Sequence, residues 1–465
     1  MTQGQLARPG WESVSEANST ATIDETAFTE VDVFPPLSEI SHGQLYGIRL
    51  SNTTVDMTHG LHRFPAKFIP QIPRWALREF GTPRMSVLDP FMGSGTTLVE
   101  AMLRPGLVRG CDVDPLARLI SRAKTDAPDP ERIALLANSV RARWRGPAKR
   151  LTVPMPGVTN FDHWFSQETW GLLQSLLNTL LDLDATESER RFLLAVFSSI
   201  LRRVSNADDQ SQKTYVSGTR LKTPPPVPAT FWRALEKATV GLRALVLAKH
   251  ADSKVSIDDA ADAVHTRLRD ASVDLIVTSP PYLESLDYMY NAMLEYFWLG
   301  SYVGVPDRDA LNELRRSQIG SRRPHSRCDL PSPLIGHVDP QNLPGWRKAG
   351  ALAYFAHMAA HFEEAARCLR GDGRYVLVVG NSQTRMATVP VHDCLTRLAA
   401  SCGLALEKAF AYRVRRHYMK FPRMGRGGII LLDWVIVLRR CNAPAPIPDP
   451  LPLPDFSLPT NAVST

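Results

Sequence analysis

Hydrophobic positions along the middle of the chain follow two alternating patterns. Short apolar runs, among them "MSVLD" (85–89), "LVRGCD" (107–112) and "VDLIVT" (273–278), have the length and composition of buried strands. The segments "TTLVEAMLR" and "PLARLISRAK" follow the first two runs and repeat apolar residues three and four positions apart, as amphipathic helices do. Buried strands that alternate with helices predict a doubly wound, Rossmann-like α/β fold with a mostly parallel sheet covered on both faces.

The last two apolar segments, residues 404–412 and 429–438, are too close in sequence for a crossover helix between them. We therefore expect them to form an antiparallel hairpin at one edge of the sheet. Together with the earlier strands they complete a predicted main domain formed by residues 46–125 and 252–440.

Two segments interrupt the alternation of strands and helices. Residues 126–251 have the pattern of several consecutive helices, more than a connection between two strands of one sheet needs, and predict an inserted helical subdomain. Residues 302–344 form a second insertion, which is basic and not repetitive. The polar residues 1–45 and the proline-rich residues 441–465 have too little patterned apolar surface to bury, and we expect both tails to be disordered.

Charge and cysteine usage narrow the class of protein. A net charge of +7 and an isoelectric point of about 9.1 favour a polyanionic partner. The six cysteines include no Cys-x-x-Cys pair, so no zinc or disulfide framework is predicted. The longest apolar stretch, "IILLDWVIVL", has ten residues with Asp433 inside it, and the N-terminus does not resemble a signal peptide. We expect a soluble cytoplasmic protein that binds neither metal nor membrane.

The segment "SVLDPFMGSGTTLVEA" places Gly93 and Gly95 between a strand and a helix. Glycines at such a turn let the backbone approach a ligand beside the helix N-terminus; the alternative is a plain strand-to-helix turn. The segment matches neither a phosphate loop nor a GxGxxG loop. Asp89, at the end of the strand, adds a negative charge that suits a cationic or hydroxyl-bearing ligand better than a diphosphate.

The next strand ends in "GCDVDP", which provides two candidate acids for a ribose. Asp112 is the first candidate to accept hydrogen bonds from both ribose hydroxyls and Asp114 the second, whereas solvated turn residues are the alternative for each. A nucleoside without a pyrophosphate, carrying a cationic centre and an ammonium group, describes S-adenosylmethionine.

Two motifs carry a resemblance to a known family. "DPFMGSGTT" closely resembles the first motif of the amino-methyltransferases of DNA, and "TSPPY" resembles their catalytic motif. "HRFPAKFIPQIPR" is similar to a segment beside the methionine end of the cofactor in some of these enzymes, and "GCDVDPLARLISRAK" to the ribose-binding segment. With the surrounding strands the resemblance covers roughly 260 residues. It implies methyl transfer from S-adenosylmethionine to N4 of cytosine or N6 of adenine, and the Ser-Pro-Pro-Tyr version is most often associated with N4-cytosine.

The resemblance also assigns residues to the cofactor. Asp259 matches the position that contacts the adenine amino group, with Asp258 as an equal rival and a helix N-cap as the structural alternative. Lys67 and Phe68 are expected near the methionine end, where Lys67 is alternatively a surface lysine. The remaining expected cofactor contacts are Asp89, Pro90, Phe91, Gly93, Gly95, Thr96, Asp112 and Asp114.

The catalytic motif has to activate an exocyclic amine, whose lone pair is delocalised into the base. We expect the Ser279 hydroxyl and the Pro280 carbonyl to accept hydrogen bonds from its N–H groups while the methyl group arrives. Pro280 and Pro281 fix φ and lack N–H groups, and Tyr282 is expected to stack on a base taken out of the duplex. Alternatively, the prolines form a rigid turn and Tyr282 is a packing residue.

Other groups near this motif have two interpretations. Glu284 and Asp287 either assist the reaction or cap and solvate the following helix. The chain contains no Pro-Cys pair, so nothing indicates the thiol nucleophile that methylation of a ring carbon needs.

Basic residues cluster in four segments, "RARWRGPAKR", "QKTYVSGTRLK", "RRSQIGSRRPHSR" and "RVRRHYMKFPRMGRGG". Arginine and lysine mixed with glycine, serine, histidine and aromatic residues favour contact with DNA, although a solvated charged surface is the common alternative. The residues expected to bind duplex DNA are Arg315, Arg316, Arg322 and Arg323, followed by Arg415, Arg416 and Arg423.

The cofactor motif precedes the catalytic motif, whereas many Ser-Pro-Pro-Tyr enzymes have the reverse order. The sequence thus predicts a DNA methyltransferase that modifies N4 of cytosine in double-stranded DNA, with a restriction endonuclease as a possible partner. The alternatives are an N6-adenine DNA methyltransferase, an RNA amino-methyltransferase, in which this motif order is common, and a non-catalytic DNA-binding protein that keeps the fold. Either insertion is a candidate for DNA recognition.

Overall fold

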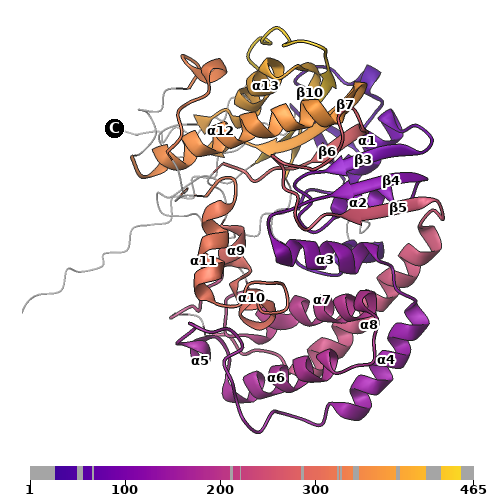
Figure 1. The fold of residues 1–465 in the computed structure, drawn as a ribbon, viewed down its shortest axis with the longest axis vertical. Coiled ribbons are helices and arrows are strands. Elements are labelled where there is room, and N and C mark those ends of the chain that lie inside the picture. Colours follow the sequence, from indigo (N-terminus) through magenta and orange to yellow (C-terminus); the bar gives the residue numbers. More distant parts are fainter. Residues whose placement is uncertain are drawn as a thin grey trace, which may run out of the picture.

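A computed structural model describes residues 27–49, 56–64, 67–209, 213–219, 221–283, 287–321, 324, 327–338, 345–383, 388–414 and 431–451. These residues form the predicted α/β fold around a mostly parallel sheet (Figure 1). The sheet contains nine described strands in the order β1-β2-β10-β11-β7-β6-β3-β4-β5. A separate pair of short strands, β8 (Ser382–Gln383) and β9 (Thr388–Val389), lies outside it.

The parallel half of the sheet carries the segments with candidate chemistry. It consists of β7 (Leu369–Gly380), β6 (Val273–Thr278), β3 (Met85–Asp89), β4 (Gly106–Gly110) and β5 (Ser253–Ile257). All five residues of β3 are buried, which explains why this strand is a continuous apolar run instead of an alternating one. Because parallel strands end at the same edge, the loops after β3, β4 and β6 meet there.

The predicted hairpin forms, but it lies inside the sheet and not at its edge. β10 (Leu404–Arg413) and β11 (Leu432–Arg440) pair antiparallel, and β11 also pairs antiparallel with β7. The strands β2 (Leu45–Ile48) and β1 (Thr29–Val31) continue the sheet beyond β10, in parallel. They have four and three residues, too few to show a strand period in the sequence.

Residues 27–45 and 441–451, which the sequence analysis assigned to disordered tails, belong to the described structure. In the N-terminal region, Phe34 and Ile40, which lie between β1 and β2 in the sequence, are buried and join the core. In the C-terminal region, Leu451 is buried and its N–H donates to Asp393 Oδ1 at 3.2 Å, so residues 441–451 pack against the domain. Isolated apolar residues in a polar or proline-rich context are sufficient here because the completed sheet and its helices provide the surface that covers them.

Helices cover both faces of the sheet. α12 (Gly345–Cys368) and α13 (Val391–Ser401) pack on one face, with Leu88 of β3. α1 (Gln71–Phe80) and α2 (Thr96–Ala101) pack on the other face, with Val87 of the same strand. Neighbouring residues of one strand thus point into two cores, as the doubly wound fold requires.

The described residues of the 126–251 segment are mostly helical. The segment contains α4 (Pro130–Arg143), α5 (Phe161–Trp164), α6 (Gln167–Leu181), α7 (Glu187–Val204) and α8 (Val227–Ala248). Figure 1 shows these helices as a layer beyond α3 (Pro115–Thr125), on the side away from the centre of the sheet. The hydrophobic core of the insertion is continuous with α3, so it is built onto the main domain.

The remaining short elements connect these layers. They are the helices α9 (Tyr288–Asn291), α10 (Met293–Leu299) and α11 (Arg308–Ser317) and the 3-10 turns η2 (Leu37–Glu39), η4 (Met57–Gly60) and η5 (Ser332–Leu334). Among the helices that the structure describes, none is long and apolar enough to cross a membrane.

Candidate active site

The glycine loop between β3 and α2 is held in place from α3. Gly93 and Gly95 have φ values of +48° and +75°, and a Cβ on Gly95 would lie 2.9 Å from Ser121 Oγ. The Ser121 hydroxyl donates to the Gly93 carbonyl at 2.7 Å, and the buried Lys124 ammonium group donates to the Ser94 carbonyl at 2.7 Å. The loop therefore needs glycine for its conformation at both positions and, at Gly95, also for the space beside Ser121.

Asp89 lies beneath this loop and joins two strand ends. Its Oδ1 accepts hydrogen bonds from the Thr278 hydroxyl at 2.5 Å and the Phe91 N–H at 3.2 Å. Its Oδ2 is buried and has no hydrogen-bond partner among the described residues. Burial raises the pKa of Asp89 to about 6. The bond to Thr278 brings the end of β6, where the catalytic motif begins, against the end of β3.

Asp112, after β4, contacts the glycine loop directly. Its Oδ2 accepts the Gly93 N–H at 2.8 Å, and its Oδ1 accepts the Asp114 N–H at 2.9 Å. Burial and the neighbouring Asp114 charge raise the pKa of Asp112 to about 7. A carboxyl group so placed has lone pairs left for further donors, such as ribose hydroxyls.

Asp114 has a structural task in addition to its place near the loop. Its Oδ1 caps α3 by accepting the Leu116 and Ala117 N–H groups and also accepts the Tyr296 hydroxyl at 2.5 Å. Its buried Oδ2 has no hydrogen-bond partner within the described part of the chain, and burial raises its pKa. Asp114, the second candidate for the ribose contact, is thus a helix cap. Asp112, the first candidate, caps no helix.

A pocket opens at the ends of β3, β4 and β6 and brings the predicted sites together. Ser279 and Pro281 of the catalytic motif line it on one side. Its lining contains most of the predicted cofactor residues, namely Lys67, Phe68, Pro90, Phe91, Gly93, Thr96, Asp112 and Asp114. Residues that the sequence interpretation missed also line it, among them Phe64, Ser94, Asp262, Ser317, Gln318 and His357.

The segment before α1 forms the wall near the glycine loop. Phe64 lies against Gly93, where a Cβ would be 3.4 Å from the ring atom Cε1. Lys67 donates from Nζ to the His59 carbonyl at 2.8 Å, and burial followed by the charge of Lys237 lowers its pKa to about 8. Lys67 is therefore a partly buried residue of the pocket wall. Phe64 had a signal in the sequence, since it belongs to the same "HRFPAKF" segment.

The acid predicted to contact adenine lies elsewhere. Asp259 forms ion pairs with Arg118 at 3.0 Å and Arg122 at 2.7 Å, and its side chain is 64% exposed. Among the described residues, the pocket lining includes Asp262 but neither Asp258 nor Asp259. The run "DDAADA" offers three acids within five positions, and only the path of the backbone shows which one reaches the pocket.

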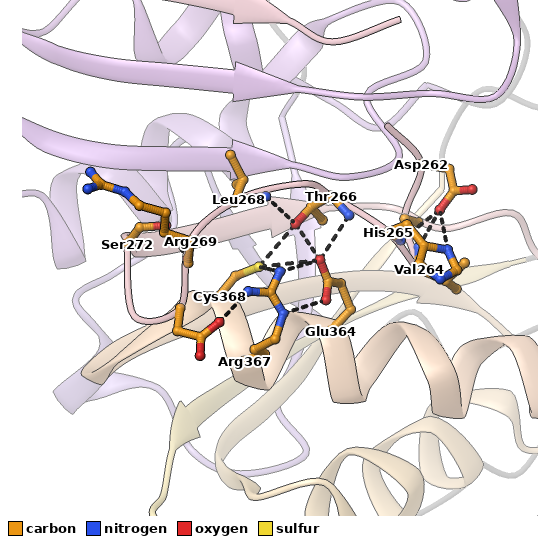
Figure 2. A network of polar contacts seen from close by, with 12 residues as sticks. Asp262, Val264, His265, Thr266, Leu268, Arg269, Ser272, Glu364, Arg367 and Cys368 are labelled. Atoms are coloured by element: carbon orange, nitrogen blue, oxygen red, sulfur yellow. Dashed lines mark hydrogen bonds and ion pairs between the residues drawn. The ribbon is translucent and has the colours of Figure 1, made fainter. Parts of the chain in front are cut away.

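Figure 2 shows how the loop that carries Asp262 is fixed. Asp262 Oδ1 accepts the N–H groups of Val264 at 2.9 Å and His265 at 2.8 Å, which closes a tight turn. Further along, the Thr266 N–H and hydroxyl both donate to Glu364 Oε1 on α12. The turn and its attachment to α12 place Asp262 at the pocket.

The catalytic motif follows β6 directly. Pro280 is buried, and Tyr282 is partly buried with its hydroxyl donating to Asp433 Oδ1 at 2.9 Å. Glu284 lies outside the described residues. Asp287 accepts the Tyr290 N–H at 2.9 Å and caps α9, which agrees with the capping interpretation.

Only two of the predicted DNA-binding arginines fall in the described part of the chain, and both are on α11. Arg315 pairs with Asp287 at 2.6 Å and lies over the Tyr290 ring at 5.4 Å. Arg316 lies 3.7 Å from Glu313 and its side chain is 55% exposed. The others, Arg322, Arg323, Arg415, Arg416 and Arg423, lie outside the described residues.

The polar residues of the described chain include no group of three or more histidine, cysteine or acidic side chains placed to hold a metal ion.

Comparison with known proteins identifies methyltransferases as relatives. No protein-family model matches the chain. The type II methyltransferase M.MvaI of Kocuria varians is 25% identical over 409 residues, which cover 80% of this chain and 86% of that protein. The type II methyltransferase M.BsoBI of Geobacillus stearothermophilus is 22% identical over 291 residues, which cover 56% of this chain and 55% of that protein. These matches support the methyltransferase resemblance of the two motifs.

Solved structures that align with the chain are also methyltransferases. They include the rRNA methyltransferase aviRa of Streptomyces viridochromogenes, with a TM-score of 0.29, 11% identity and coverage of 84% of this chain and 93% of that one. A putative DNA modification methylase of Thermus thermophilus has a TM-score of 0.20 and 16% identity, and covers 41% of this chain and 53% of that one.

Proposed function

We propose that the protein is an S-adenosylmethionine-dependent DNA methyltransferase that modifies an exocyclic amine, with N4 of cytosine as the preferred target. One observation carries the proposal: the glycine loop and the Ser-Pro-Pro-Tyr motif line the same pocket, and Thr278 and Asp89 join their two strands by a 2.5 Å hydrogen bond. Methyl transfer needs a loop that binds the nucleoside of the cofactor and a loop that binds the amine. Both line this pocket.

The pocket suits S-adenosylmethionine in charge and in hydrogen bonding. Ser94 and Asp114 line the pocket, and the buried oxygens Ser94 Oγ and Asp114 Oδ2 have no partner among the described residues, as expected of a site that receives donors from a ligand. When bound, this cofactor supplies an electrophilic methyl group on a positively charged sulfur. The acids around the pocket favour that charge, whereas they would repel a diphosphate.

Individual residues have distinct tasks in this proposal. Asp112 accepts the ribose hydroxyls, while Lys67 and Phe68 contact the methionine end. Asp262 takes the adenine contact first expected of Asp259, because it lines the pocket and Asp259 is engaged by two arginines.

At the catalytic motif, the chain has to hold the amine and accept its N–H groups. The Ser279 hydroxyl and the Pro280 carbonyl are the acceptors, and the rigid prolines keep them in position before the reaction. Tyr282 stacks on the extruded base, which offsets part of the few kcal/mol that unstacking costs. The amine loses its proton after methylation, so no general base with a shifted pKa is required.

Three features support DNA as the substrate: the type II methyltransferase relatives, the net charge of +7 and the exposed Arg316, which directly precedes the pocket residue Ser317. The helical insertion and the segment after α10 are the candidates for reading the sequence. N6-adenine methylation is the second candidate, since both amines present similar N–H groups to Ser279 and Pro280. A partner endonuclease and a cytoplasmic location stay predictions.

The test is to incubate the protein with methyl-labelled cofactor and either duplex DNA or transcribed RNA, digest the product and identify the labelled nucleoside. We expect label in N4-methylcytosine from DNA. Label only in N6-methyladenine would contradict the choice of base, and label only in RNA would contradict the choice of substrate. Ser279→Ala should abolish transfer, whereas Ser401→Ala, at the end of α13, should retain it.

A further inference from the structure

Asp433 of β11 connects the catalytic motif to the far half of the sheet. Its Oδ1 accepts the Tyr282 hydroxyl at 2.9 Å, and its Oδ2 accepts the Tyr412 hydroxyl at 3.0 Å. Tyr412 is the residue opposite Asp433 on β10, and Gly380 is opposite it on β7. One carboxyl group therefore receives two phenol donors, one from the sheet and one from the catalytic loop.

A buried carboxyl group at position 433 costs folding stability, so a purely structural role does not account for it. Asp433 is 9% exposed, and the rest of β11 from Leu432 to Leu438 is apolar and buried. A carboxyl group in such a strand loses hydration that its hydrogen bonds only partly restore, and an apolar residue with phenylalanine partners often gives a more stable core. A requirement for a defined position of Tyr282 explains why the polar cluster is present.

The backbone and one hydrogen bond fix the two ends of the Tyr282 side chain. Its Cβ is fixed by the backbone that follows Pro281, and Leu283 on the other side is buried. Its hydroxyl, at the far end of the ring, is fixed by Asp433. A ring fixed at both ends has lost the freedom that stacking on a base would otherwise have to remove.

We propose that Asp433 is a positioning residue, which acts through the Tyr282 hydroxyl to hold the aromatic ring where it stacks on the extruded target base. The proposal rests on the proposed function, because it concerns the same reaction. Tyr412 contributes indirectly by fixing the second carboxylate oxygen, so that Asp433 itself cannot rotate away.

The protonation states agree with this arrangement. Burial, followed by the charge of Asp433, raises the pKa of Tyr282 well above its usual value, and the same two causes raise the pKa of Tyr412. Both phenols therefore remain O–H donors at neutral pH. Burial raises the pKa of Asp433 to about 6, which still leaves it mostly ionised at pH 7 and able to accept both bonds.

The test compares Tyr282→Phe, Asp433→Asn and the double variant in the full-length protein. Turnover is measured on duplex DNA, and base extrusion is followed by the fluorescence of 2-aminopurine placed next to the target cytosine. We expect each single variant to lower kcat roughly tenfold, the value of one hydrogen bond to a charged group, and to weaken the fluorescence change. Because the Asp433 carboxyl acts only through the Tyr282 hydroxyl, we expect the double variant to be no slower than either single variant. Cofactor affinity should change less than about twofold in all three variants.

Ser401→Ala is the control, because Ser401 also donates a side-chain hydrogen bond, to the Leu398 carbonyl at 2.7 Å, but is not part of the pocket lining. It should keep wild-type kcat. Tyr282→Phe retains the ring and spares the fold, so full kcat in this variant would overturn the role of Asp433. Multiplicative losses in the double variant would do the same. A wild-type protein that methylates no nucleic acid would overturn the proposed function and this inference with it, a result distinct from the other two.

Discussion

The backbone N–H of Gly93 donates to Asp112 Oδ2 at 2.8 Å, so the glycine loop after β3 and the acid after β4 form one unit. The other oxygen of Asp112 accepts the Asp114 N–H at 2.9 Å. These bonds fix the orientation of the carboxyl group before any ligand arrives. A preoriented acceptor loses little conformational freedom on binding.

We therefore predict that Asp112→Asn lowers the affinity for S-adenosylmethionine at least about tenfold, because a hydrogen bond to a charged acceptor contributes roughly 1.5–3 kcal/mol. Isothermal titration calorimetry measures this change. Asp129→Asn is the control, since Asp129 caps α4 by accepting the Glu131 N–H at 2.9 Å and is not part of the pocket lining. Unchanged affinity in Asp112→Asn would contradict the ribose assignment.

The raised pKa of Asp112 predicts a pH effect on stability. Its pKa is about 7 in the folded protein against a usual value of 3.8, so the folded state binds the proton more tightly between these values. The contribution of Asp112 to stability is therefore complete below pH 4 and is lost as the pH rises towards 7. Without cofactor, the free energy of unfolding of the wild type relative to Asp112→Asn should fall over this range. Urea unfolding at pH 4.5, 5.5 and 6.5 measures it, and a rising difference would contradict the protonation argument.

Alanine substitutions at Gly95 and Gly304 separate two costs to stability: the backbone strain of a left-handed residue and a steric clash of the added Cβ. Both have positive φ, +75° and +83°, but a Cβ at Gly95 meets Ser121 Oγ at 2.9 Å, while at Gly304 nothing lies within 4 Å. Each alanine substitution should cost about 1–2 kcal/mol in backbone strain. We predict a further loss of stability in Gly95→Ala, measured by thermal unfolding, together with weaker cofactor binding. Equal effects of the two substitutions on both measurements would show that the space beside Ser121 is unimportant.

The parts of the site that are local in sequence were predictable. Gly93 and Gly95 lie between a strand and a helix within one short segment, and Ser279 to Tyr282 follow a strand whose apolar run ends at Thr278. The order of strands and helices then brings both segments to one edge of the sheet, since parallel strands end together. The pocket lining agrees with this inference for Gly93, Thr96 and Ser279.

Contacts that depend on strand register or on a single turn were not predictable. Tyr282 and Asp433 are 151 positions apart, and their hydrogen bond depends on where β11 pairs with its neighbours. In the sequence, Asp433 was only a charge that interrupted an apolar stretch. The position of Asp262 likewise depends on a turn closed by its own side chain, which composition does not reveal.

The acids after β5 provide a direct test of the adenine contact. We predict that Asp262→Ala weakens cofactor binding about tenfold, because it removes an acceptor from the pocket lining. Asp259→Ala should leave affinity within about twofold, since its carboxylate is exposed and paired with Arg118 and Arg122. Calorimetric titration of both variants measures the difference, and a larger loss in Asp259→Ala would restore the original assignment.

Because Asp262 also closes its turn, the same variants need a check of local structure. Asp262→Asn retains an acceptor oxygen for the Val264 and His265 N–H groups. We expect thermal stability near that of the wild type in Asp262→Asn and reduced affinity in both Asp262 variants. Full affinity in Asp262→Asn would mean that the carboxylate charge contributes nothing to binding.

Arg315 and Arg316 are neighbours on α11 with different surroundings, and we predict different effects on DNA binding. Arg315 is engaged by Asp287, the residue that caps α9 just after the catalytic motif, whereas Arg316 is 55% exposed beside Glu313. Arg316→Ala should reduce the slope of log affinity against log salt by about one, the value for one lost phosphate contact. Arg315→Ala should leave the slope unchanged and lower kcat about two- to fivefold, as loss of a partly exposed ion pair predicts. Asp287→Asn should reproduce the lower kcat.

Fluorescence anisotropy on duplex DNA between roughly 50 and 200 mM salt measures the slopes. An equal reduction of the slope in both arginine variants would show that Arg315 is a phosphate contact.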